Sequence, residues 1–165
     1  MKFTEIAALS GKKGLFKVIN PTRSGVILES LDGSKKRMIA GASAKVSVFS
    51  EISIYVIDEV ESVPLQEVFR VIHQTYAGEV GLDKKSDPEE LKSFFKSILP
   101  NYDADKVYVS DIKKVITWYQ SLLSLELDYL IKDDVHEVPV KKKKLEIGDD
   151  VEKVKAKKKN EKGVQ

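Results

Sequence analysis

The chain has 165 residues, 42% apolar and 33% charged, with a net charge of +2. It contains no cysteine, and no apolar run approaches the roughly eighteen residues that a membrane-spanning helix needs. This composition is typical of one or two small globular units, and it excludes disulfide scaffolds, collagen-like repeats and wholesale disorder. With no thiol and only His73 and His136 as imidazoles, the chain offers little for redox or zinc chemistry. We expect no cofactor and no metal.

The N-terminal stretch lacks the charged, apolar and cleavage regions of a secretory signal, since Glu5 interrupts its short apolar segment. We expect a cytoplasmic protein without a membrane partner.

The near-neutral total charge conceals three differently charged segments. Residues 1–57 carry nine basic and four acidic side chains, a net of +5. Residues 58–131 carry eight basic and fourteen acidic side chains, a net of −6, and residues 132–165 carry eleven lysines and eight acids, a net of +3. The first segment is therefore basic although the whole chain is nearly neutral.

Short strands separated by turn residues dominate residues 1–60. Runs rich in β-branched and apolar residues predict strands at residues 3–9, 15–19, 26–31, 35–40 and 52–57. Asn20-Pro21 favours a turn after the second run, and Asp32-Gly33 tolerates the positive φ of a tight hairpin after the third. Five short strands with brief connections favour a small SH3-like antiparallel β barrel over a sandwich.

Helical periodicity replaces the strands in residues 61–132. Apolar residues recur every three or four positions from Leu65 to Tyr76, from Leu91 to Leu99 and from Ile112 to Leu123. Asp87-Pro88 and Ser110-Asp111 suit the starts of the second and third helices, and residues 125–131 either extend the third or fold back on it. A unit of three or four helices is predicted.

Residues 133–165 hold no aromatic side chain and scatter their apolar residues among lysines and acids. Such a composition buries too little surface to offset an ordering cost of roughly 1–2 kcal/mol per residue. We therefore expect a disordered Lys/Glu-rich tail after an α+β body.

Several stretches of the body carry a resemblance to a known family. They are residues 10–17, 25–31, 52–55, 63–65 and 99–114. They resemble an uncharacterised bacterial family, a domain of unknown function with a small N-terminal β unit and a C-terminal helical part. The resemblance spans about residues 1–130 and implies the same two-part architecture, with no activity, ligand or catalytic residue.

Asn101, Asp103 and Asp105 alternate as the first ligands of a calcium-binding EF-hand loop do. The sixth position of that loop is Lys106 instead of glycine, and the twelfth is Ile112 instead of a bidentate glutamate. A turn of the Asx type is the better interpretation.

Other candidate groups also favour structural roles. His73 has no partner at metal or triad spacing, and Gly11-Lys12-Lys13-Gly14 matches no phosphate-loop motif and precedes a strand. No elbow motif presents a serine nucleophile, so we expect no enzyme. Trp118 is explained by packing or, alternatively, by a partner-binding hot spot.

Six cations of the N-terminal segment fall in its turns and at its strand ends. They are Lys12, Lys13, Arg23, Lys35, Lys36 and Arg37. Gathered at one end of a small barrel, they would attract nucleic-acid phosphates; scattered, they would only aid solubility. The sequence thus favours a non-catalytic binding module for RNA or DNA, with a protein–protein interaction adaptor as the alternative.

Overall fold

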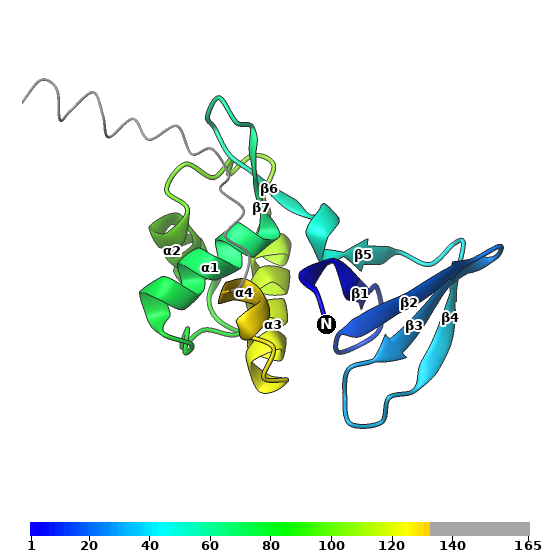
Figure 1. Cartoon of the computed structure of the whole chain (residues 1–165). Coiled ribbons are helices and arrows are strands. Elements are labelled where there is room, and N and C mark those ends of the chain that lie inside the picture. Colours follow the sequence, from blue (N-terminus) through cyan, green and yellow to red (C-terminus); the bar gives the residue numbers. More distant parts are fainter. Residues whose placement is uncertain (133–165) are drawn as a thin grey trace, which may run out of the picture. The chain divides into compact units, whose positions relative to one another are not determined.

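The structure, a computed structural model, describes residues 1–132 and contains strands followed by helices (Figure 1). The strands are β1 (Ile6–Leu9), β2 (Phe16–Thr22), β3 (Gly25–Ser30), β4 (Arg37–Gly41), β5 (Val46–Val48), β6 (Ser53–Tyr55) and β7 (Ser62–Pro64). The α-helices are α1 (Leu65–Tyr76), α2 (Pro88–Ile98), α3 (Val109–Ser124) and α4 (Tyr129–Lys132), and 3₁₀ turns cover Phe3–Glu5 and Phe49–Glu51. The predicted α+β class is confirmed. The predicted tail, residues 133–165, lies outside the described residues.

The first five strands form one antiparallel sheet in the order β4-β3-β2-β1-β5, and β6 pairs with β7 in a separate hairpin. A small apolar cluster of Leu9, Phe16, Leu28 and Ala40 lies within the larger sheet. Among the described strands, no pairing joins β4 to β5. The predicted closed SH3-like barrel is therefore not confirmed, although the antiparallel sheet is.

The second strand passes through the predicted turn at Asn20-Pro21 and ends at Thr22. Proline is tolerated here because β1 pairs with β2 only at Lys17 and Phe16, so this end of β2 has β3 as its sole neighbour. A register shift between Val18 and Asn20 adds a bulge. The turn moves instead to Arg23 and Ser24.

Two three-residue strands, β5 and β7, escape the sequence analysis. β5 lies between the predicted strands at residues 35–40 and 52–57, and β7 lies directly before the predicted helical run that begins at Leu65. Strands this short owe their form to pairing with β1 and β6, which local sequence does not reveal.

The helices begin and end close to the predicted positions. Helix α1 ends at Tyr76, and the next residue, Ala77, adopts the left-handed conformation that caps it. Pro88 occupies the first turn of α2, which its fixed φ favours. The chain then folds back after α3: Glu126 has a φ of +54° and α4 lies against α1. Gln66 Nε2 donates to the Leu130 carbonyl at 3.0 Å, which holds α4 in place.

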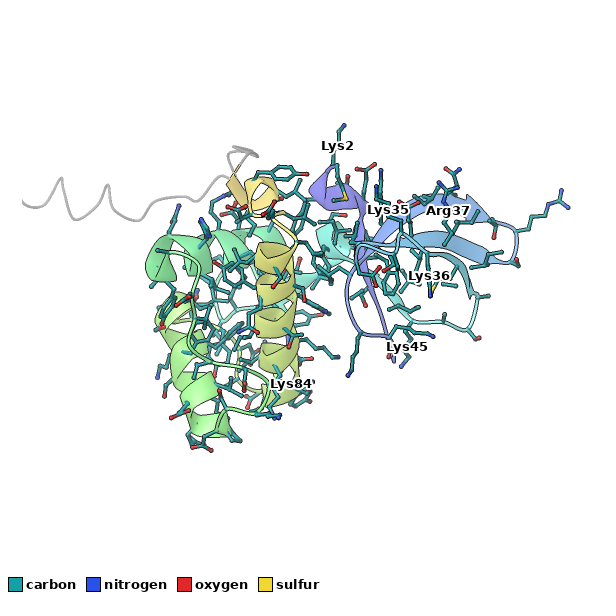
Figure 2. The ribbon with its side chains drawn as sticks, turned by 90° about the horizontal axis from the view of Figure 1, so that it is seen from below. Lys2, Lys35, Lys36, Arg37, Lys45 and Lys84 are labelled. Atoms are coloured by element: carbon teal, nitrogen blue, oxygen red, sulfur yellow. The ribbon has the colours of Figure 1, made fainter. Side chains whose placement is uncertain are left out.

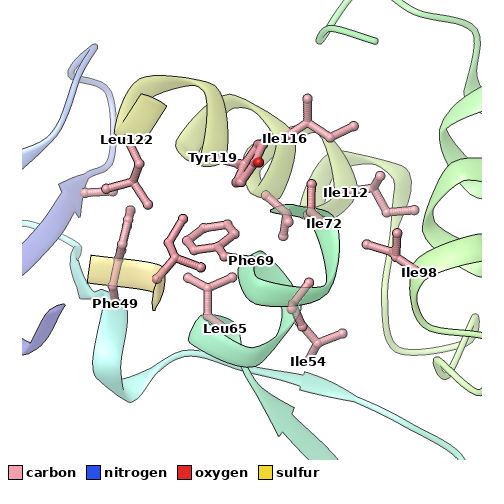
Figure 3. Packing of buried hydrophobic residues seen from close by; sticks show 14 of the residues in the cluster. Phe49, Ile54, Leu65, Phe69, Ile72, Ile98, Ile112, Ile116, Tyr119 and Leu122 are labelled. Atoms are coloured by element: carbon pink, nitrogen blue, oxygen red, sulfur yellow. The ribbon is translucent and has the colours of Figure 1, made fainter. Parts of the chain in front are cut away.

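One continuous apolar core joins the N-terminal sheet to the helices (Figure 3). Phe3 and Phe49 contact Phe69 of α1 with ring centres 6.2 and 6.0 Å apart, and Phe69 contacts Tyr119 of α3 at 5.9 Å. The described residues 1–132 accordingly belong to a single compact unit. The secondary structure changes from strands to helices near residue 60, and residues on both sides of this point contribute to the core.

Within residues 1–132, no helix combines the length and apolar content needed to span a bilayer.

Candidate nucleic-acid interface

Two connections of the sheet lie side by side because of strand register. Phe16, the first residue of β2, pairs with Ser30, the last residue of β3. The Leu31 N–H then donates to the Leu15 carbonyl at 3.0 Å, so the two segments remain hydrogen-bonded beyond the ends of the strands. The β1–β2 connection (residues 10–15) and the β3–β4 connection (residues 31–36) therefore emerge at the same end of the sheet.

Four of the predicted cations occupy these two connections. Lys12 and Lys13 lie in the first and Lys35 and Lys36 in the second, and all four are exposed. Figure 2 shows Lys35 and Lys36 over the β strands, whereas Lys84 lies over the helices. These four lysines therefore lie in connections that emerge at the same end of the sheet.

Lys45 joins the four, and sequence reasoning missed it. The Ser10 N–H donates to the Lys45 carbonyl at 3.0 Å, which brings the residue before β5 beside the β1–β2 connection. The alternating Val46-Ser47-Val48 was the available signal for this strand. We call the five residues Lys12, Lys13, Lys35, Lys36 and Lys45 the lysine end.

Arg23 and Arg37 do not belong to the lysine end. Arg23 lies in the β2–β3 turn beyond the Thr22–Gly25 pair, at the other end of β2. Six strand residues, about 20 Å, separate that turn from Phe16. Arg37 begins β4, but its Nε donates to Glu29 Oε2 at 2.9 Å, so its charge is already partnered.

Asp32 is the one acid in the connections that carry the lysine end. Hydrogen bonds from the hydroxyls of Ser34 and Ser30, then the Ser34 N–H at 2.9 Å, lower the pKa of this carboxyl below 3.8, and the charge of Lys36 adds to the effect. Asp32 is therefore ionised at neutral pH. The lysine end carries five positive charges against one negative charge.

A groove of about 300 Å³ separates these connections from α3. Thr117, Ser121 and Ser124 line it, but their hydroxyls donate to helix carbonyls four residues earlier, at 2.8–2.9 Å. Hydroxyls engaged in this way present acceptor lone pairs, which repel phosphate oxygens. These three hydroxyls therefore have no free hydrogen to donate to an anion in the groove.

The other candidate groups take structural positions. Asp103 Oδ1 accepts the Asp105 N–H at 3.0 Å, which is the predicted Asx turn, and Asn101 Nδ2 donates to Asp58. His73 Nδ1 lies 3.1 Å from the Tyr119 hydroxyl. Within residues 1–132, no three His, Asp or Glu side chains are grouped to hold a metal ion.

Comparison with known proteins matches two family models. Residues 3–49 match the domain of unknown function DUF5606, and residues 52–122 match the domain of unknown function DUF6852. A solution NMR structure of a structural-genomics target from Bacteroides vulgatus is 36% identical, with a TM-score of 0.64, over 76% of this chain and 88% of the other. No curated protein matches.

The chain therefore belongs to the same family as the Bacteroides vulgatus protein, a family described by domains of unknown function. This confirms the resemblance found in the sequence and supplies no activity to carry over. Function has to be argued from the chain's own residues.

Proposed function

We propose that this protein is a non-catalytic module that binds RNA or DNA through the lysine end. The observation that supports the proposal is the backbone pairing of the two connections, which carry Lys12, Lys13, Lys35 and Lys36 and contain one acid, Asp32. Several exposed cations in one place raise the local concentration of a polyanion and release its counterions on binding.

Two finer features belong to the same proposal. Strands β1 to β4 form a meander, and β5 returns to pair with β1, as in a sheet that curls around an inner apolar cluster. We infer an SH3-like barrel that is open between β4 and β5. A cytoplasmic location is part of the same proposal, and without cysteine the fold does not depend on an oxidising compartment.

The proposed recognition is of the phosphate backbone, with little preference for base sequence. Phe3, Phe16 and Phe49 are all buried, so the sheet offers no aromatic ring on which a base could stack at this end. Lysine acts as a flexible point charge and does not read base edges in the bidentate way that arginine does. Affinity should therefore depend on salt much more than on sequence.

Fluorescence anisotropy with labelled single-stranded RNA and with duplex DNA, across a salt series, tests this directly. Contacts from four to five lysines predict a slope of log affinity against log salt of about −3 to −4.5. Replacing Lys12, Lys13, Lys35 and Lys36 together with glutamine is expected to abolish most of that slope.

The matched control removes the same charge elsewhere. Lys84, Lys85, Lys92 and Lys96 are exposed lysines before and on α2, and their quadruple replacement by glutamine should leave the affinity within about twofold. Equal losses in the two quadruple variants would show only a general charge effect. The absence of binding at low salt would remove the proposal.

A further inference from the structure

A second groove, of about 260 Å³, lies between β6, the residue 106–107 segment and α3, and Ser47 of β5 also lines it. Its lining is mainly apolar, with Ile52, Val107 and Val115 beside the half-buried ring of Trp118. Tyr55 stands at its margin with 51% of its surface exposed. An exposed tyrosine beside an unfilled apolar groove is typical of contact surfaces.

One edge of β6 opens toward this groove. The Val56 N–H donates to the Glu61 carbonyl and the Leu65 N–H to the Ile52 carbonyl, so the even-numbered residues of this segment bond toward β7. The backbone groups of Ser53 and Tyr55 therefore point the other way. There the Tyr55 carbonyl accepts the Asp103 N–H at 2.9 Å.

This outer pairing is limited to the bridge between Val56 and Tyr102, where the Ile57 N–H also donates to the Asn101 carbonyl at 2.7 Å. The Asp103 carbonyl accepts the N–H groups of Lys106 and Val107, so it does not complete the pair with Tyr55. Within residues 1–132, the outward N–H and C=O of Ser53 have no backbone hydrogen-bond partner, and Ser53 is exposed. An unpaired strand edge of this kind is a template for an added strand.

The charges beside the groove are mainly positive. Lys106 and Lys114 line it, and Lys106 Nζ lies 4.9 Å from the centre of the Tyr55 ring. Asp111 is the acidic residue in the lining, and its Oδ2 accepts the Tyr108 N–H at 3.0 Å. An arriving segment therefore meets two lysines and one carboxylate that already has a partner.

We propose that this groove binds an extended peptide, with alternating acidic and apolar side chains, that adds as a strand to the outer edge of β6. An extended chain points successive side chains to opposite faces, so apolar residues enter the groove beside Trp118 while acidic residues meet Lys106 and Lys114. Backbone hydrogen bonds to Ser53 fix its position. This site uses none of the five lysines of the lysine end and makes the protein a link between two partners.

The probe is a fluorescein-labelled eight-residue peptide of alternating valine and glutamate, titrated into the intact chain. Trp118 fluorescence and the amide NMR shifts of Ser53 and Tyr55 report its place of binding. Peptides of alternating valine and lysine, and the valine–glutamate peptide with every second backbone nitrogen methylated, are the ligand controls. At least tenfold weaker binding is expected for both.

Two protein variants test the site itself. Ser53→Pro removes the outward N–H while keeping the bonds to β7, and Ile52 already has φ −89° and ψ 130°, which suit a residue before proline. It should weaken binding at least tenfold. The double variant K106E/K114E should do the same, whereas K92E/K96E on α2 should stay within twofold.

Several outcomes overturn the proposal. The first is that the methylated peptide binds as tightly as the unmethylated one, and the second is that an RNA oligonucleotide displaces the peptide. The third is that sedimentation shows a concentration-dependent dimer, which the K106E/K114E variant does not form. The last would show that a second copy occupies the groove. The methylated peptide is measured with the parent protein, so it still tests the proposal if the Ser53→Pro variant does not fold. The quadruple glutamine variant of Lys12, Lys13, Lys35 and Lys36 should still bind the peptide. This result would show that peptide binding does not depend on the proposed nucleic-acid site.

Discussion

The ring of Phe49, directly after the last strand of the N-terminal sheet, lies 5.2 Å from the ring of Trp118 on α3. Phe49 is fully buried and also contacts Phe3 and Phe69, so it touches the start of the chain, the first helix and the third. Such a residue couples the sheet to the helices. The two parts are therefore expected to unfold together.

Phe49→Ala should lower the free energy of unfolding by about 3–5 kcal/mol, the usual cost of removing a buried phenylalanine. Trp118 fluorescence and far-ultraviolet circular dichroism should still report one shared transition in urea. Ile57→Ala, at a side chain 72% exposed, should cost less than about 0.5 kcal/mol. Two separated transitions in the parent protein would contradict the coupling.

The sequence predicts the helices well because their signals are local. Asp87-Pro88 and the repeat of Leu91, Phe94 and Phe95 specify α2 without reference to the rest of the chain. The short strands are different. Val46–Val48 and Ser62–Pro64 become strands only through pairing with β1 and β6. Pro21 is tolerated in β2 because the pairing of β2 with β1 stops at Lys17.

Gly25 illustrates a constraint that a single sequence leaves hidden. A Cβ placed on this residue would lie 1.8 Å from the Ala40 carbonyl oxygen in the neighbouring strand β4. Gly25→Ala must therefore push β3 and β4 apart, and we expect a loss of about 1–3 kcal/mol or more in urea unfolding. Gly33→Ala, where no atom lies within 4 Å, is the matched control and should be nearly neutral.

Tyr119 should make stability fall at alkaline pH. Burial of the phenol, and then the charge of Asp128, raise the pKa of Tyr119 above its usual 10.0. The unfolded chain therefore loses its proton first, so the free energy of unfolding declines as pH rises from about 10 toward the folded pKa. The decline should be seen in urea unfolding between pH 9 and 11.

Tyr119→Phe removes the titrating group and should flatten this decline. At neutral pH the variant should lose about 1 kcal/mol, since the phenol is 3.1 Å from His73 Nδ1. Tyr108→Phe, at a side chain 65% exposed, should keep the parent profile. A Tyr119→Phe profile parallel to that of the parent would show that other groups control alkaline stability.

The candidate interface was only partly predictable. Lys12, Lys13, Lys35 and Lys36 lie beside glycine and Asp-Gly turn signals in the sequence, but only the pairing of Phe16 with Ser30 brings their two connections to one end of the sheet. Arg23 was misplaced because the turn it occupies is on the opposite end of β2. No sequence pattern places Lys45 beside Ser10, since that depends on the return of β5 to β1.

Asp32→Asn should tighten nucleic-acid binding. The change removes the single acid among the lysines, and an exposed charge pair contributes about 0.2–1 kcal/mol, so affinity should rise by up to about fivefold at low salt. Asp83→Asn is the matched control, because Asp83 also accepts the N–H two residues on, at 2.7 Å, and adjoins two lysines. It should change affinity less than twofold. A similar gain in both variants, measured by anisotropy, would place the contact outside the lysine end.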